Sequence, residues 1–276
     1  NKAQELVADW ISAYKNWDSL SWRPDILGLR LASWTTHFAF VAVDADQKLL
    51  KNFYTELGRQ SRHLSRTVMQ AAPGRYRVLA VKGLIYAGIA VPECDGYLMQ
   101  GLEHLEREVA HQVYSDGGHA SRNPMLQMRV MRDLVEVRET LSAAHIGVPT
   151  WLQVSIERMA PMLRAMRHGD GGLALFHEGT SGDPEEIDVL LSKANVRGKK
   201  LFSGPHSGYH RLEAGKTVLI MDGGASPDQA TNKWGHAGAL AFEMSTGKER
   251  LIVNCGTTRH LGKDWHQALR STAAHS

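Results

Sequence analysis

Three short histidine-bearing segments contain the residue types that could do chemistry in this chain. The first is Asp116-Gly117-Gly118-His119, which lies just ahead of an expected helix start. Its two glycines permit positive φ and close backbone approach. A loop histidine there can face a ligand anion, because free N–H groups lie at a helix N-terminus. The alternative interpretation is a turn that carries a solvated histidine.

The other two segments lie further along the chain. In Gly235-His236-Ala237-Gly238 the histidine enters an expected strand, where it could be a base, a metal ligand or a structural residue. Residues 205–211 contain two histidines, a tyrosine and an arginine. Strand alternation places Tyr209 and Arg211 on one face and His210 on the other. The alternative for this segment is a β-edge with a packed tyrosine.

The elements that must position these segments change in kind along the chain. Up to about residue 170, apolar residues recur at helical spacing, which predicts about seven helices joined by short turns. Asn123-Pro124 is an N-cap candidate followed by proline at the first helical position. Pro161 is expected to kink or break the last helix. The helices are expected over residues 2–17, 24–43, 46–72, 76–91, 98–114, 123–142 and 149–167.

After Gly169-Asp170-Gly171-Gly172 the apolar period changes to that of strands. We therefore predict a helical domain over residues 1–170 and an antiparallel β-domain over residues 171–276. We expect the chain to be a fragment of a longer protein, with an incomplete β-domain. The strands are expected over residues 173–176, 209–213, 217–221, 239–244 and 250–253, and the last four should form two hairpins.

Composition excludes several classes of protein. The chain has 276 residues, of which 43% are hydrophobic and 22% charged, as in an ordinary globular protein. No apolar run approaches the ~20 residues that a membrane span needs. The net charge is +3 and basic residues alternate with acidic ones, so no nucleic-acid-binding stripe is expected. The P-loop, G-x-S-x-G and H-E-x-x-H motifs are absent, and we expect no cofactor.

The motifs together resemble those of the heparinase II/III family of polysaccharide lyases. Residues 116–124 resemble the family's D-G-G-H-x-E-R-S-P segment, and residues 206–224 resemble the first strands of its β-domain. Residues 235–256 resemble its "H-A-D-A-L-x-F…D-x-G" strand pair, and residues 270–275 the start of its "S-T-x-A-H-N-T" strand. The resemblance implies a bacterial protein with an incomplete α/α toroid followed by a β-sandwich, in the periplasm or cell envelope.

The resemblance also implies cleavage of an acidic, uronic-acid-containing, glycosaminoglycan-like polysaccharide by β-elimination. Such a reaction needs donors that neutralise the sugar carboxylate, a tyrosine or histidine base, and an acid for the leaving oxygen. His119 matches the toroid histidine that would neutralise the carboxylate. The other candidate catalytic residues are His236 and Tyr209, and the candidate substrate-binding residues are Arg122, Asn123, His206 and His210.

The chain departs from the family pattern at several of these positions. Ser121 stands where a glutamate is usual, and Trp234 where a histidine is frequent. Asn254 replaces an aspartate that would bind zinc together with His275, and an amide oxygen is a poor zinc ligand, so we predict no bound metal. Leu126-Gln127 likewise replaces a frequent Tyr-His pair. We therefore predict a polysaccharide lyase, with a non-catalytic carbohydrate-binding or scaffold relative that has a degenerate site as the alternative.

Overall fold

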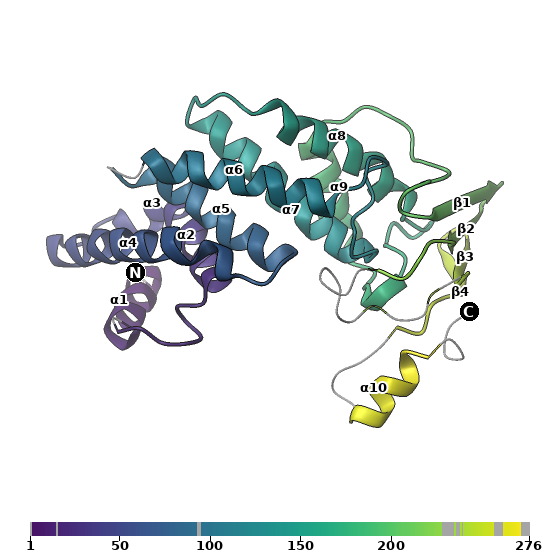
Figure 1. Ribbon diagram of the computed structural model, residues 1–276, viewed down its shortest axis with the longest axis horizontal. Coiled ribbons are helices and arrows are strands. Elements are labelled where there is room, and N and C mark those ends of the chain that lie inside the picture. Colours follow the sequence, from purple (N-terminus) through teal and green to yellow (C-terminus); the bar gives the residue numbers. More distant parts are fainter. Residues whose placement is uncertain are drawn as a thin grey trace. The chain divides into compact units, whose positions relative to one another are not determined.

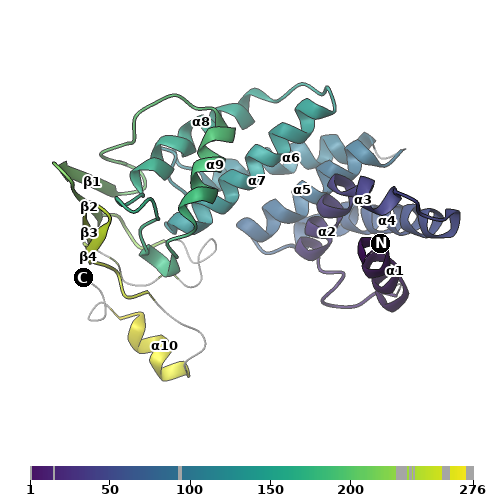
Figure 2. The same ribbon diagram turned by 180° about the vertical axis from the view of Figure 1, so that it is seen from behind.

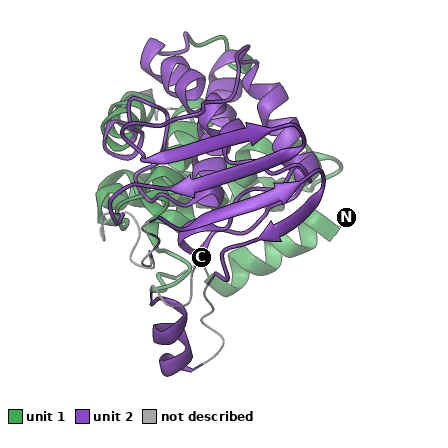
Figure 3. Ribbon diagram, turned by 90° about the vertical axis from the view of Figure 1, so that its right-hand side faces the viewer, with its two compact units in different colours: residues 1–108, 143–146 green, residues 109–142, 147–276 purple. Residues whose placement is uncertain are grey.

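The computed structural model describes residues 2–14, 16–92, 95–227, 235, 238, 240–256 and 262–271. Contacts between Cα atoms divide the chain into two compact units, coloured separately in Figure 3. Unit 1 comprises residues 1–108 and 143–146, and unit 2 comprises residues 109–142 and 147–276. In the described part of the chain, unit 1 is helical, whereas unit 2 combines helices with one antiparallel sheet.

Unit 1 is built around α5, which is apolar on all sides. Its residues from Val78 to Gly88 are all buried, as the unbroken apolar pattern of this segment predicts. The expected helix over residues 24–43 is divided at His37 into α2 and α3. The elements of the unit, visible in Figure 1, are α1 (Lys2–Tyr14), α2 (Pro24–Thr36), α3 (Phe38–Ala42), α4 (Gln47–Thr67), the 3-10 turn η1 (Val68–Gln70), α5 (Arg75–Ala90) and the first part of α6 (Asp95–Gln112).

Helices α2 and α5 approach each other through two glycines. A Cβ added to Gly28 would lie 2.1 Å from the carbonyl oxygen of Leu79 on α5. A Cβ added to Gly83 would lie 2.2 Å from the Cα atom of Gly28. The two backbones are therefore in direct contact, and only glycine permits that distance.

Helices α7 and α8 lie where the sequence predicts helices, whereas α9 and α10 lie where it predicts none. α7 begins at Pro124, and the Asn123 side chain caps it by accepting a hydrogen bond from the Leu126 amide at 2.9 Å. Pro161 was expected to kink or break this helix, and it does not break it, because α8 continues through this residue. Its buried stripe, which includes Ile156 and Leu163 on either side of the proline, holds the helix together. The helical elements are α7 (Pro124–Ala143), α8 (Thr150–Ala165), the 3-10 turn η2 (Phe176–Glu178), α9 (Pro184–Ala194) and α10 (Lys263–Leu269).

The sheet of unit 2 confirms both expected hairpins. Its four strands lie in the order β1-β2-β3-β4, and each pair is antiparallel (Figure 2). Gly215 and Gly247 form the two hairpin turns with φ of +59° and +56°. The strands are β1 (Tyr209–Ala214), β2 (Thr217–Asp222), β3 (Phe242–Thr246) and β4 (Glu249–Ile252).

Two expectations for the segment before the sheet are wrong. Residues 173–176 form no strand, because the Leu173 amide donates to the Ser181 carbonyl and the Leu175 amide donates to the Glu243 carboxylate. Residues 184–194 form α9, although no helix is expected there. Asp183 caps this helix by accepting from the Glu185 amide.

The change from helices to strands falls after α9, and the contacts group most of α7, with all of α8 and α9, in the same unit as the sheet. The division into domains at residue 170 thus remains a proposal based on the change of sequence pattern. Among the described residues, no helix is both long and apolar enough to cross a bilayer.

Replacing Gly83 by alanine should destabilise unit 1 by about 3 kcal/mol, because the new methyl group overlaps the α2 backbone. Gly58 in α4 is the matched control, since a Cβ there meets nothing within 4 Å. Gly58→Ala should stabilise the protein by roughly 0.5–1 kcal/mol through helix propensity. Urea unfolding of both variants measures the difference, and equal stabilities would contradict the contact between α2 and α5.

Candidate functional site

A buried carboxylate at the end of β2 joins three segments of unit 2. Asp222 is 1% exposed. Its Oδ1 accepts a hydrogen bond from the Arg122 guanidinium, and its Oδ2 lies 2.6 Å from Nε2 of His177. Both partners are buried as well. Charged groups are rarely buried without such pairing, because their desolvation is costly.

The backbone around Asp222 is strained at several positions. Arg122, His177, Glu178 and Leu240 all have positive φ, between 53° and 65°. The Leu240 amide also donates to the Asp222 carbonyl at 2.7 Å. A non-glycine residue in this region costs on the order of 1–3 kcal/mol, and such residues concentrate at functional sites. We therefore take the surroundings of Asp222 as the candidate site.

The Arg122 side chain fills the space between the loop after β2 and the ring of Tyr209. Its guanidinium donates to the Ala225 carbonyl and lies 5.2 Å from the Tyr209 ring centroid. Gly224 makes room for it, since a Cβ there would lie 2.4 Å from the guanidinium nitrogens. The structure thus brings the substrate-binding candidate Arg122 and the catalytic candidate Tyr209 together, but as packed neighbours.

Tyr209 is closed off from solvent. Its hydroxyl donates to the Arg122 carbonyl, and its ring packs against Phe176 with centroids 5.5 Å apart. Burial raises the pKa of the Tyr209 hydroxyl well above its ordinary value, and the nearby Asp222 charge adds to the rise. The phenol is therefore protonated at neutral pH and already has an intramolecular acceptor.

Asn123 connects the start of α7 to the strained loop at His177. Its side-chain oxygen caps the helix, and its Nδ2 donates to the His177 carbonyl at 2.8 Å. Both halves of the amide are therefore used inside the protein. Asn123 therefore holds the loop in position, and its contact with substrate stays a prediction.

His119 is also buried, at 2% exposure, with both ring nitrogens engaged. Nε2 lies 2.8 Å from Oε1 of Gln112, and Nδ1 lies 2.7 Å from the Ser121 hydroxyl. The partners assign the proton to Nε2, because the Gln112 oxygen can only accept, which leaves Nδ1 to accept from Ser121. Ser121, which replaces the family's glutamate, thus completes the hydrogen bonding of this imidazole.

Burial lowers the pKa of His119 to about 4. The ring is therefore neutral at pH 7, contrary to the cationic form expected of a group that neutralises a substrate carboxylate. The physical reason is desolvation with uncharged partners only. A catalytic role for His119 remains a prediction, but the structure shows it as a satisfied core histidine.

Asp116 fastens the loop of His119 to the segment that enters β1. Its carboxylate accepts from the backbone amides of His206 at 2.8 Å, Ser207 at 2.7 Å and Gly118 at 2.9 Å. Burial alone would raise the pKa of Asp116, but these hydrogen bonds and one from the Ser207 hydroxyl outweigh it and lower the pKa. The motif's aspartate is therefore a structural clamp.

The remaining candidates lie apart from the Asp222 cluster or outside the described residues. The His206 side chain is exposed, and only its backbone takes part in the clamp. His210 is half-buried, with Nδ1 3.3 Å from the Ser203 hydroxyl. His236, Trp234 and His275 fall among residues that the structure does not describe.

A second polar network, buried at His168 and Glu243, lies under the sheet, and no sequence motif indicates it. His168 contacts Glu243 at 3.0 Å and Ser245 at 2.9 Å. Arg250 on β4 pairs with Asp170, with N–O distances of 2.7 and 3.1 Å. The local pattern hides this network, because alternation in β3 would place the polar Glu243 and Ser245 on the solvent face, whereas both are buried. The network ties the segment after α8 to the sheet.

No group of three or more His, Cys, Asp or Glu side chains among the described residues could hold a metal ion. Asn254, at the expected zinc position, is buried, and its side-chain oxygen accepts from the Gly256 amide at 3.1 Å. Because His236 and His275 are not described, the absence of zinc stays a prediction.

Comparisons with known proteins agree on one family. Residues 5–187 match the model for the heparinase II/III N-terminus, and residues 196–276 match the heparinase II/III-like C-terminal model. FtsZ-localized protein C of Caulobacter vibrioides is 30% identical over 256 residues, which cover 92% of this chain and 44% of that protein.

Solved structures share the fold at low sequence identity. A crystal structure of heparinase III has a TM-score of 0.80 at 15% identity, covering 99% of this chain and 50% of that one. A mutant of the heparan sulfate lyase HepC from Pedobacter heparinus has a TM-score of 0.75 at 18% identity, covering 99% and 49%. The chain spans about half the length of these relatives.

The low pKa of His119 predicts acid sensitivity. The unfolded chain takes up a proton on this ring near pH 6.5, whereas the folded chain does so only near pH 4. Acidification across that window therefore favours unfolding, by about 3 kcal/mol in total. His119→Gln should remove this part of the pH dependence of the unfolding free energy, whereas His206→Gln, at an exposed site, should leave it unchanged. An identical pH profile in all three proteins would show that His119 is not desolvated.

Asp222→Asn should cost about 3–5 kcal/mol, because it leaves the buried Arg122 charge without its counter-ion. Asp188→Asn is the matched control. Asp188 pairs with Arg167 at 2.6 Å, but its side chain is 65% exposed, so its replacement should cost less than about 1 kcal/mol. Denaturant unfolding measures both, and similar losses would count against Asp222 as the centre of the site.

Proposed function

The chain belongs to the heparinase II/III family, and we propose that it is a non-catalytic binding or scaffold member of that family. The proposal rests on the burial of His119 and Tyr209, the two catalytic candidates that the structure describes. The His119 ring and the Tyr209 hydroxyl are buried, and their hydrogen-bonding atoms are used within the protein. A general acid or base must come within hydrogen-bond reach of the substrate.

The replaced family positions support the same conclusion. Ser121 and Gln127 both serve His119: the Ser121 hydroxyl bonds its ring, and the Gln127 side-chain oxygen accepts from its backbone amide at 3.3 Å. Residues that would act on a substrate in a lyase thus act on the protein's own loop here. A chain that keeps the fold while using these groups for stability is suited to binding.

The likeness to FtsZ-localized protein C supports a scaffold role in the cell-division apparatus. This likeness extends over most of the chain, whereas the lyase structures share the fold at 15–18% identity. The chain spans about half the length of its relatives. We propose that the whole protein collects with FtsZ at the division site and binds an acidic polysaccharide there.

A lyase remains the second candidate, on the strength of one arrangement. His177 and Asp222 form a histidine–carboxylate pair 2.6 Å apart at strained backbone. A carboxylate orients a histidine base in many enzymes. Because His177 is itself buried, the base in contact with substrate would be the predicted His236, which lies outside the described residues.

The ultraviolet absorbance of the unsaturated uronic product distinguishes the two candidates. The full-length protein is incubated with a panel of uronic-acid polysaccharides, including heparan sulfate, hyaluronan and alginate. We expect no rise in absorbance on any of them. A rise that is abolished by His236→Ala and retained by the exposed control His206→Ala would establish the lyase instead.

A fluorescent fusion of the full-length protein tests the scaffold role separately. Expressed in its own host together with labelled FtsZ, it should concentrate at mid-cell only while FtsZ is present there. An even distribution in dividing cells would overturn the division role.

A further inference from the structure

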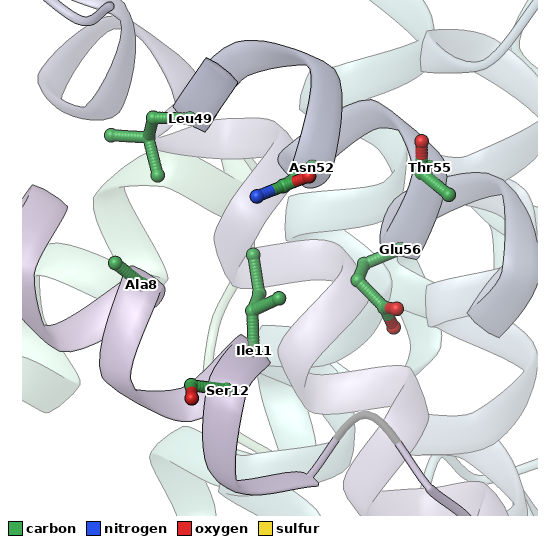
Figure 4. A pocket seen from close by; sticks show the side chains of 7 residues that line it. All are labelled: Ala8, Ile11, Ser12, Leu49, Asn52, Thr55 and Glu56. Atoms are coloured by element: carbon green, nitrogen blue, oxygen red, sulfur yellow. The ribbon is translucent and has the colours of Figure 1, made fainter.

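Unit 1 contains a pocket between α1 and α4 that belongs to neither network described above. Its volume is about 340 Å³, within the range of ~300–1,000 Å³ that is usual for small-molecule sites. Figure 4 shows side chains from the two helices around it. Its lining includes Ala8, Ile11 and Ser12 from α1, and Leu49, Asn52 and Glu56 from α4.

Glu56 presents an unused carboxylate oxygen to this pocket. The residue is 7% exposed. Arg59 donates to Oε2 only, through Nε at 3.1 Å and a terminal nitrogen at 2.8 Å. Oε1 has no hydrogen bond within the described part of the chain. Oε1 keeps contact with solvent, so a donor supplied by a ligand can reach it.

Two further polar side chains of the pocket can also bond a ligand, whereas the Thr55 hydroxyl already donates to the Lys51 carbonyl. Asn52 and Ser12 make no side-chain hydrogen bond to any described residue, and both are exposed. In Figure 4 the Asn52 amide extends from α4 toward Ile11, and the Glu56 carboxylate projects from the next turn of α4. The pocket therefore offers an acceptor, an amide and a hydroxyl beside the aliphatic side chains of Ile11 and Leu49.

The charges around Glu56 exclude most charged ligands. Arg59 pairs with the carboxylate, and Arg30 interacts with it electrostatically. Burial lowers the pKa of Arg30 to about 10, so its guanidinium remains charged at neutral pH. A ligand ammonium would meet two guanidinium groups, and a ligand carboxylate would meet the free Glu56 oxygen. An uncharged donor fits best.

We propose that this pocket binds an acetamido sugar. The acetamide N–H donates to Oε1 of Glu56, and the acetamide carbonyl accepts from Nδ2 of Asn52. The methyl group contacts Ile11 and Leu49, and Ser12 bonds a ring hydroxyl. The inference is separate from the proposed function: a positive lyase assay would overturn that function and leave this pocket unaffected.

Titration calorimetry with three trisaccharides tests the ligand class. Triacetylchitotriose carries the acetamide, cellotriose carries a hydroxyl at the same carbon, and the deacetylated chitosan trimer carries an ammonium. We expect binding of triacetylchitotriose, with cellotriose at least about tenfold weaker, because its single hydroxyl cannot serve Glu56 and Asn52 together and it has no methyl group to contact Ile11 and Leu49. Equal binding of cellotriose, tighter binding of the chitosan trimer, or no binding of any at millimolar concentration would each overturn the proposal.

Variants locate the site. Asn52→Ala should weaken triacetylchitotriose binding about fivefold, the effect of one neutral hydrogen bond. Glu56→Gln should weaken it at least about tenfold, because Arg59 holds the amide oxygen and turns the N–H₂ group toward the ligand. Lys51→Ala, an exposed change on the same helix, is the control and should bind as the wild type does.

The exposed Asn52→Ala variant decides the matter if Glu56→Gln fails to fold. Thermal unfolding of each variant establishes that α4 is intact before titration. Unchanged affinity in a folded Asn52→Ala protein would show that the sugar binds elsewhere.

Discussion

The architecture of unit 2 depends on one buried carboxylate. Asp222 holds Arg122 from the loop before α7 and His177 from the segment after α8. A buried ion pair is not by itself a strong source of stability, since desolvation offsets much of the attraction. It is instead very sensitive to loss of either partner. Asp222 therefore constrains the geometry of unit 2, because the loops that carry Arg122 and His177 must both lie next to it for the buried charges to be paired.

Several residues that the family resemblance predicts to act on substrate lie around Asp222 and have structural roles. The Tyr209 hydroxyl donates to the Arg122 carbonyl, and the Asn123 side chain donates to the His177 carbonyl. His119 and Asp116 stabilise the preceding loop from within. The residue types that could move protons in a solvent-accessible site thus serve here as hydrogen-bond partners in the packed interior. Accessibility, more than residue identity, separates the two uses.

Local signals in the sequence were sufficient for most elements. The N-cap at Asn123, the all-apolar α5 and the glycine turns of the hairpins depend on residues within a few positions of one another. The strand expected over residues 173–176 is absent because its amide donors find partners at Ser181 and Glu243. Such distant partners are not visible in a local pattern.

The candidate site could be predicted only in part, for the same reason. The sequence motifs identified the loops of His119 and Tyr209 but not their burial, which depends on packing from several helices. The central pairs join residues 100 and 45 positions apart, Arg122 with Asp222 and His177 with Asp222. Neither Asp222 nor His177 stands out by spacing or type. Identifying them required the fold.

The large separation between these partners affects how the chain assembles during synthesis. Arg122 leaves the ribosome 100 residues before Asp222, and His177 leaves it 45 residues before. Until β2 emerges, both loops lack the counter-charge that allows them to be buried and strained. Helices α7 to α9 can form early from local contacts, but their connecting loops must remain hydrated until the hairpin docks. Asp222, the last residue of β2, therefore completes the pairing of segments that were made long before it.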